Sequence, residues 1–403
     1  MNQKNQMLNM KSRSEKMSKI ELQKLDTISK LDWELSDADT RYGTHSFHPY
    51  SAKYIPQIPN YLISNFSQKN DLILDNFLGS GTTLVEAKLL GRNAIGVDIN
   101  PLACLISKVK TTKISEEKIE HIKKLCNSIK TDILFSRGQT ALFKFKKPNS
   151  KLSNQNFNEL NKYVEKWFQK NVIIELSIIR NHIENISDAD LSDFLLVAFS
   201  SILRSVSNTS SGFGNLMIDK NARPKTRIFE KFQHSLLRML DDIQFFNKNA
   251  TDSNLSIVND DSRNLHFIKD ESIDLICTHP PYMASVPYAE YQRLSLWWLG
   301  YSRKELEQKL IGGRRSSIDL ADRFEKDMEK VFSEMYRVLK SRAFCCVVIG
   351  NPVYRGKIWK LNELLQHQGK ECGFQFMKEI TRGKYKQTMG KMKEEFVLIF
   401  KKD

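Results

Sequence analysis

The stretch from Leu72 to Asp98 constrains the fold of this chain most strongly. Leu72 to Leu74 is a short apolar strand, and a glycine-rich turn follows it from Phe77 to Thr83. The next residues, Leu84 to Leu90, have helical spacing, and a second strand runs from Asn93 to Val97. A strand, a turn, a helix and a second strand in this order form a βαβ unit, which predicts parallel strands in an open α/β sheet.

The turn in this unit also predicts the kind of ligand. It lacks the third glycine of a dinucleotide fingerprint and the lysine of a phosphate-binding loop. Gly79 and Gly81 would let the backbone approach a ligand closely, and Asp98, which closes the second strand, suits ribose hydroxyls. Asp75, at the tip of the first strand, would meet a cationic or zwitterionic group. A ligand with a ribose, an adenine and an amino-acid tail therefore fits better than a dinucleotide.

A second informative segment is Thr278-His279-Pro280-Pro281-Tyr282, directly after the apolar run 273–277. Neither proline can extend a sheet or a helix, so the chain must leave the strand as a rigid, nearly extended turn. Ligands of open α/β sheets bind at the carboxyl ends of strands. A stiff loop with a polar side chain, free carbonyls and a tyrosine ring can hold a planar group that carries an amine on its edge.

Taken together, these segments resemble the amino-group DNA methyltransferases, which bind S-adenosylmethionine. The strings DNFLGSGTT and GVDINPLA resemble motifs I and II of that family, and THPPY resembles its catalytic motif IV. Residues 45–56, HSFHPYSAKYIP, resemble motif X; residues 260–263 stand where motif III would touch the adenine, and residues 395–400 resemble the last antiparallel strand. Two residues depart from the family pattern: His279 replaces the usual Asp, Asn or Ser, and Asn76 stands where Pro is common.

The resemblance implies roles for particular residues. The expected cofactor-binding residues are Tyr50, Lys53, Asp75, Phe77, Gly79, Gly81, Thr82, Thr83, Asp98, Ile99 and Asp261. The expected catalytic residues are His279, Pro280, Pro281 and Tyr282. The Pro280 carbonyl and an unprotonated His279 nitrogen would accept the amine hydrogens, and Tyr282 would stack on a flipped base. An alternative stays open, in which His279 only bonds a neighbouring loop and Pro280 acts alone.

The expected fold is a Rossmann-like class I methyltransferase fold, which is a doubly wound, mostly parallel seven-stranded sheet with a helical insertion. Strands are predicted near 71–75, 93–98, 255–259, 273–278, 343–350, 374–380 and 394–401, the last two as an antiparallel pair. We expect an N-terminal arm over 1–40, a catalytic domain over 41–113 and 250–403, and the insertion over 114–249. The insertion is interpreted either as a target-recognition element or as a scaffold for the cofactor domain.

The formal charge of +15 makes a polyanion the first partner to consider. The resemblance implies double-stranded DNA and leaves a cognate restriction endonuclease open. The candidate DNA contacts are Arg223, Lys225, Tyr288, Tyr291, Arg314 and Arg315. The stripe Leu294, Trp297, Trp298 and Tyr301 has helical spacing and is interpreted as core.

Several features narrow the activity. Cytosine N4 is favoured over adenine N6 by the resemblance, and methylation at ring carbon C5 is disfavoured because no cysteine follows a proline. An RNA amino-group methyltransferase and a catalytically silent DNA-binding relative remain alternatives. The six cysteines show no zinc-site spacing and, with no secretory signal at the N-terminus, favour a reduced, cytoplasmic protein.

Overall fold

The computed structural model describes residues 18–51, 53–138, 164–210, 216–283, 287–313, 319–383 and 394–403. Its centre is a seven-stranded sheet in the order β3-β2-β1-β4-β5-β9-β8. The strands are β1 (Leu72–Asp75), β2 (Asn93–Val97), β3 (Leu255–Val258), β4 (Ile273–Thr278), β5 (Leu339–Gly350), β8 (Phe374–Arg382) and β9 (Glu395–Lys402). β9 is antiparallel to both of its neighbours, whereas β3, β2, β1, β4 and β5 pair in parallel. The predicted fold class and all seven predicted strands are therefore confirmed.

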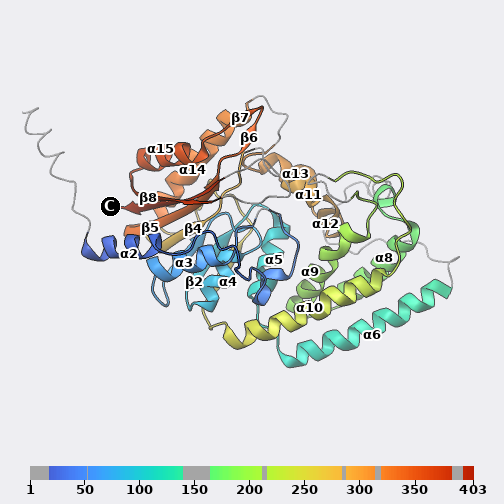
Figure 1. Ribbon diagram of the computed structural model, residues 1–403. Coiled ribbons are helices and arrows are strands. Elements are labelled where there is room, and N and C mark those ends of the chain that lie inside the picture. Colours follow the sequence, from blue (N-terminus) through green and yellow to red (C-terminus); the bar gives the residue numbers. More distant parts are fainter. Residues whose placement is uncertain are drawn as a thin grey trace, which may run out of the picture.

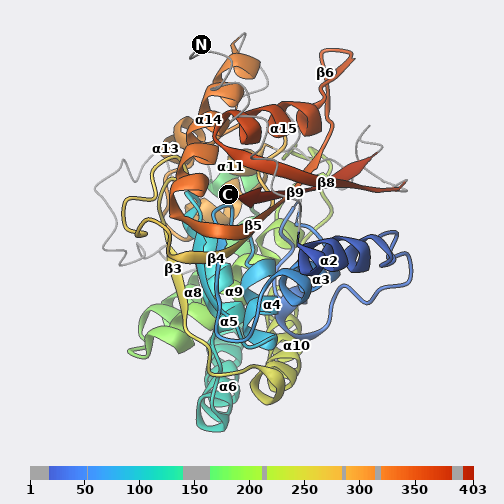
Figure 2. The ribbon, with the colours of Figure 1, turned by 90° about the vertical axis from the view of Figure 1, so that its left-hand side faces the viewer.

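Two layers of helices cover the sheet, because alternate residues of each strand point to opposite faces. Leu275 and Cys277 of β4 pack with α2 (Lys19–Ser29), α3 (Gln57–Phe66) and α4 (Thr82–Leu89). Ile276 of the same strand packs with α14 (Leu320–Val338) and α15 (Leu361–Glu371). Ile273 joins the same cluster, because the register of β4 shifts between Ile273 and Leu275. Figure 2 shows α14 and α15 above the sheet and α3, α4 and α5 (Pro101–Thr111) below it.

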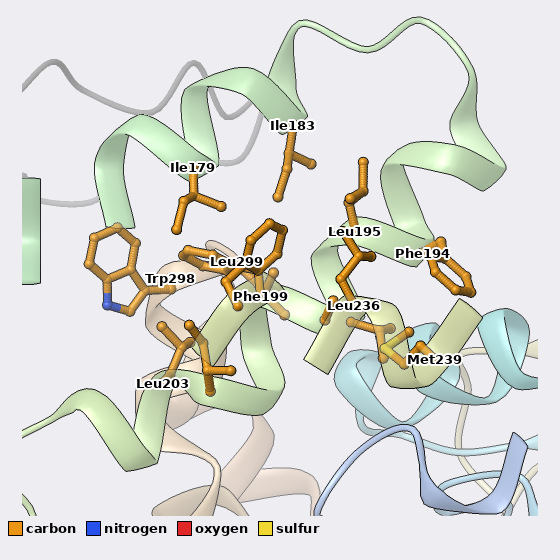
Figure 3. Close-up of a cluster of buried hydrophobic side chains, with 14 of the residues drawn as sticks. Ile179, Ile183, Phe194, Leu195, Phe199, Leu203, Leu236, Met239, Trp298 and Leu299 are labelled. Carbon is orange, nitrogen blue, oxygen red and sulfur yellow. The ribbon is translucent and has the colours of Figure 1, made fainter. Parts of the chain in front are cut away.

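The segment between α5 and β3 is helical. It contains α6 (Glu116–Gly138), α8 (Lys170–Glu184), α9 (Ala189–Val206) and α10 (Ile228–Asn249), which lie together beside the sheet in Figure 1. These helices share one apolar cluster with α5 and with α12 (Arg293–Trp298). Figure 3 shows Trp298 and Leu299 among the side chains of α8 and α9. The interpretation of the aromatic stripe as core is confirmed, because Trp298 is only 6% exposed and its ring meets Phe199 edge-on.

Two details differ from the predicted strands. β5 begins at Leu339, four residues earlier than expected, because the polar residues 340–342 hide its start in the sequence. A small antiparallel hairpin, β6 (Val353–Tyr354) and β7 (Lys357–Ile358), was not predicted, since its two strands have only two residues each. Among the described helices, none combines the length and the apolar character that spanning a membrane requires.

Candidate active site

The candidate site lies where the strand order of the sheet reverses. From β1 the chain continues to β2 and β3 on one side, whereas β4 and β5 lie on the other side. The turns after β1 and β4 therefore flank one crevice at the carboxyl ends of the two strands, where open α/β sheets bind ligands. A cavity with about 760 Å³ of empty space, part of it open to solvent, lies there. Its lining residues are Tyr50, Lys53, Tyr54, Phe77, Leu78, Gly79, Ser80, Thr82, Asp98, Ile99, Asn100, Asp261, Ser262, His279, Pro281, Tyr288, Lys309, Leu310 and Ile311.

Asp98 is tied to the glycine-rich turn. Its Oδ2 accepts a hydrogen bond from the Gly79 N–H at 2.7 Å, and its Oδ1 accepts one from the Asn100 N–H at 2.8 Å. Burial raises the pKa of Asp98 to about 6, although these two hydrogen bonds act in the opposite direction. The carboxylate is therefore a preorganised acceptor at the cavity wall that is ionised at neutral pH.

Gly81 has a structural role beside the cavity. Its φ of +78° is in the left-handed region, and it is the N-cap of α4. A Cβ at this position would lie 2.8 Å from the Cβ and 3.0 Å from the Cα of Ser107 on α5. Position 81 therefore requires glycine for two reasons, which are the left-handed backbone conformation and the close approach of α4 and α5.

We expect Gly81→Ala to lower the free energy of unfolding by about 2–4 kcal/mol, because left-handed strain and overpacking each cost about 1–3 kcal/mol. Urea unfolding followed by circular dichroism would measure this loss. Gly79→Ala is the matched control. Gly79 also has a positive φ, but its Cβ would meet no atom closer than 3.6 Å, so only the strain should appear. Equal losses in the two variants would contradict the packing argument.

Asp75 is not among the residues that line the cavity, so its predicted contact with a ligand has no support in the geometry and stays a prediction. Asp75 is 1% exposed and accepts hydrogen bonds from the hydroxyls of Thr83 and Thr278 and from the Phe77 N–H. Burial raises the pKa of Asp75 to about 6. Asp75 and Thr83 therefore hold the turn after β1 and the end of β4 together, behind the cavity wall. The predicted cofactor-binding residue Gly81 is likewise not among the residues that line the cavity.

Aromatic rings form much of the remaining wall. Tyr50 and Tyr288 lie with their ring centroids 6.5 Å apart and tilted by 32°. Tyr288 was predicted to contact nucleic acid, but the structure places it in this cavity, opposite the predicted cofactor residue Tyr50. Lys53 also lines the cavity, and its Nζ donates to the His45 carbonyl at 2.7 Å. The wall thus offers flat apolar faces beside a few fixed polar groups, a composition typical of small-molecule sites.

The loop after β4 places His279 at the cavity and Tyr282 behind it. His279 Nε2 lies 2.7 Å from the Tyr282 hydroxyl, which donates to Glu395 Oε1 at 2.8 Å. The imidazole of His279 stacks on Tyr54 with centroids 5.0 Å apart and planes inclined by 12°. Tyr282 is 6% exposed and belongs to the apolar cluster that the buried side chains of α14 form with the sheet. Its ring is therefore not a free surface in this structure, and its stacking on a base stays a prediction.

Most of the remaining predicted residues line the same cavity, among them Phe77, Gly79, Thr82 and Ile99. Pro281 lines the cavity beside His279, whereas Pro280 is buried. Asp261 lines the cavity too, but both of its carboxylate oxygens accept hydrogen bonds from the Arg263 guanidinium.

Of the candidate DNA contacts that the structure describes, only Arg223 is exposed. The ring of Tyr291 is covered by Arg204, whose guanidinium lies 4.5 Å from the ring centroid. Arg223 is exposed, Lys225 is half-buried, and the carbonyls of both are bound by amide side chains of the 169–171 segment. Arg314 and Arg315 lie outside the described residues.

Sequence reasoning missed several lining residues. Ser80 is buried at the wall, and its hydroxyl has no partner within the described structure. Asn100 was detectable, since an Asn before a Pro is a helix start signal, and its side chain indeed caps α5. Residues 309–311 had no signal, because a distant loop after α13 (Arg303–Lys309) brings them to the cavity.

Comparison with known proteins gives consistent results. A family model described as DNA methylase matches residues 2–109. The type II methyltransferase M.MvaI of Kocuria varians is 32% identical over 305 residues, covering 69% of this chain and 63% of that protein. M.MjaII of Methanocaldococcus jannaschii is 26% identical over 339 residues, covering 65% of this chain and 64% of that protein. M.BsoBI of Geobacillus stearothermophilus is 25% identical over 301 residues, with coverages of 67% and 55%. The chain thus spans less than two thirds of the length of each of these relatives.

Proposed function

We propose that this chain, a member of the amino-group DNA methyltransferases, is an enzyme that methylates DNA. It transfers a methyl group from S-adenosylmethionine to an exocyclic amine of a base. The observation that carries this proposal is the single cavity wall shared by Asp98 and His279. Asp98 directly follows β2, and His279 directly follows β4. A cofactor site and an amine-accepting site are therefore next to each other, as a direct transfer requires.

The residues of the cavity fit S-adenosylmethionine. The Asp98 carboxylate would accept hydrogen bonds from the ribose hydroxyls, and Tyr50 and Tyr288 would flank the cofactor with their rings. The buried Ser80 hydroxyl, which has no partner in the described structure, would bind a polar group of the cofactor. A bound S-adenosylmethionine would supply an electrophilic methyl group on a positively charged sulfur.

The loop after β4 would activate the amine. The lone pair of an exocyclic base amine is conjugated into the ring, so the amine is a poor nucleophile. Acceptors that draw its two hydrogens out of the ring plane would localise that lone pair. A His279 nitrogen at the cavity wall and the Pro280 carbonyl are the acceptors that we propose. The two groups would hold the amine in an attacking orientation, which lowers the barrier mainly through alignment and electrostatics.

The rate of methylation should depend on pH through His279. Burial lowers the pKa of His279 below its usual value, with Glu395 opposing this shift and Arg382 adding to it. Tyr54 and Tyr282 are the other titratable groups that face the ring. The imidazole accepts only when it is neutral. We therefore expect kcat to stay constant down to the ordinary histidine pKa of about 6.5 and to fall at more acid pH.

The profile should be measured at saturating cofactor, with circular dichroism showing that the protein stays folded. The value of kcat/KM for S-adenosylmethionine should also fall as the pH passes about 6, because Asp98 becomes protonated. His279→Asn is the control for the kcat profile, since an amide oxygen does not titrate. Two outcomes would contradict His279 as the acceptor. One is a kcat that already falls above pH 6.5, and the other is a kcat of His279→Asn that still falls at acid pH.

The decisive experiment uses labelled S-adenosylmethionine with DNA and, separately, RNA, followed by nucleoside analysis of the labelled polymer. We expect N4-methylcytosine in DNA; the choice of cytosine N4 over adenine N6 rests on the motif resemblance alone. Label in RNA only would favour the RNA methyltransferase alternative. Cofactor binding without label in either polymer would show a silent relative and overturn the proposal.

The proposal implies that DNA is the partner of this protein and that the protein acts in the cytoplasm. The relatives are named type II methyltransferases, so we also propose that the methylation is site-specific. Arg223 and Lys225 remain candidate phosphate contacts on the helical insertion. A restriction endonuclease is a further possible partner that co-expression with the flanking genes would test.

A further inference from the structure

We infer that Tyr282 and Glu395 are positioning residues that hold His279 in one tautomer, with the proton on Nε2 and the lone pair on Nδ1. This inference rests on the proposed function, because it states how the amine acceptor of that site is prepared. It assigns a task to the hydroxyl of Tyr282, separate from the predicted stacking of the ring, and it gives Glu395, on the last strand, a role in the reaction.

The three side chains form a hydrogen-bonded chain that ends at a buried ion pair. His279 Nε2 lies 2.7 Å from the Tyr282 hydroxyl, and that hydroxyl lies 2.8 Å from Glu395 Oε1. Glu395 pairs with Arg382, its partner in the register of β9 and β8. The side chains of Arg382 and Glu395 are 3% and 6% exposed, and Arg382 Nε also donates to the Trp33 carbonyl at 2.9 Å.

The position of one proton determines the tautomer. A phenolic hydroxyl has a single hydrogen, and a carboxylate paired with a guanidinium only accepts. The Tyr282 hydrogen is therefore donated to Glu395, so Tyr282 must accept from His279. His279 Nε2 must then carry a hydrogen, and in the neutral ring the lone pair is on Nδ1. The same logic, in which a carboxylate fixes the tautomer of an imidazole, operates in hydrolase triads.

This tautomer suits the proposed reaction. Nδ1 is bonded to Cγ, so it occupies the position that Oδ1 has in an asparagine side chain. The stack of the imidazole on Tyr54 restrains the orientation of the ring at the cavity wall. In the other tautomer Nδ1 would carry a hydrogen, and two donors would face each other when an amine bound. The Tyr282 and Glu395 contacts therefore select the form of His279 that can accept.

Tyr282→Phe is the most direct test, because it keeps the ring and the Arg382–Glu395 pair but removes the hydroxyl. We expect kcat to fall about 10-fold, which is less than the roughly 100-fold loss expected when a group at the reacting centre itself is removed. The Kd for S-adenosylmethionine should stay unchanged.

Glu395→Gln should also lower kcat, although it leaves Arg382 buried without a counter-charge and should lower the stability of the protein. Glu379→Gln on β8 is the matched control, since Glu379 binds Asn362 and Gln366 and does not line the cavity.

A readout that does not depend on activity is the nitrogen NMR spectrum of the labelled histidines, with His279 assigned by difference from His279→Asn. We expect a protonated Nε2 and an unprotonated Nδ1 in the wild-type protein, and a mixture of tautomers in Tyr282→Phe. A protonated Nδ1 in the wild-type protein would overturn the inference.

A double-mutant cycle separates positioning from packing. In the His279→Asn background the acceptor is a fixed oxygen, so Tyr282→Phe should change kcat less than about 3-fold. An equal loss in both backgrounds would overturn the inference and leave Tyr282 a purely structural role. If the wild-type protein bound cofactor but methylated no polymer, the proposed function would fail, whereas the NMR spectrum would still decide the tautomer.

Discussion

His279→Ala should lower kcat for DNA methylation by about 100-fold or more, which is the loss expected when a preorganised hydrogen-bonding group at a reacting centre is removed. His279 lines the cavity and is stacked on Tyr54, so its removal deletes a positioned acceptor. The Kd for S-adenosylmethionine should stay within a few-fold, because the cofactor would be bound mainly by the turn after β1 and by Asp98. Single-turnover kinetics with saturating cofactor would measure the chemical step directly.

His279→Asn is the matched control for this loss. It keeps an acceptor bonded to Cγ, so it should retain much more activity than the alanine variant. If His279→Ala methylated DNA at nearly the wild-type rate, the Pro280 carbonyl would act alone, and His279 would only support the loop. Thermal unfolding of both variants would show that neither result comes from a loss of folded protein.

Asp98→Asn should raise the Kd for S-adenosylmethionine by roughly 100-fold. Two charge-assisted hydrogen bonds to ribose hydroxyls contribute about 1.5 kcal/mol each or more, and about 3 kcal/mol corresponds to a factor of roughly 100. The substitution also disturbs the turn, since the amide nitrogen of the new side chain would face the N–H of Gly79 or of Asn100. Isothermal titration calorimetry would measure the affinity.

Asp252→Asn is the control for the change of net charge. Asp252 pairs with Lys113 at the surface, and its side chain is 98% exposed. The affinity for the cofactor should therefore be unchanged in this variant. An Asp98→Asn protein that bound S-adenosylmethionine as tightly as the wild type would show that the ribose lies elsewhere. The cofactor pose proposed above would then be wrong.

The sequence predicted the sheet well because its strands have local signals. The runs 273–277 and 344–349 are apolar and strand-sized, and the glycine-rich turn between β1 and α4 identifies the βαβ unit. The order of these elements then limits the possible topologies, since crossover connections between parallel strands have one hand. The position of the cavity at the ends of β1 and β4 followed from this topology, before any side-chain contact was known.

Particular side-chain roles could not be predicted, because they depend on neighbours that are far apart in the sequence. Asp75 and Asp98 both stand at the carboxyl ends of apolar strands and look equivalent in the sequence. In the structure Asp75 is buried against Thr83 and Thr278, whereas Asp98 faces the cavity. Tyr288 looked like a nucleic-acid contact until α11 (Tyr288–Tyr291) was seen to place it opposite Tyr50.

The sequence by itself determined that this chain folds into a methyltransferase-type sheet and where its two ligand-binding turns lie, since periodicity and turn chemistry are local properties. Only the tertiary structure decided what surrounds the His279 imidazole. The register of β8 and β9 brings together Arg382 and Glu395, of which Glu395 lies 113 residues after Tyr282. The hydrogen-bonding state of His279 depends on that pairing, because a buried imidazole takes the tautomer that its neighbours can satisfy.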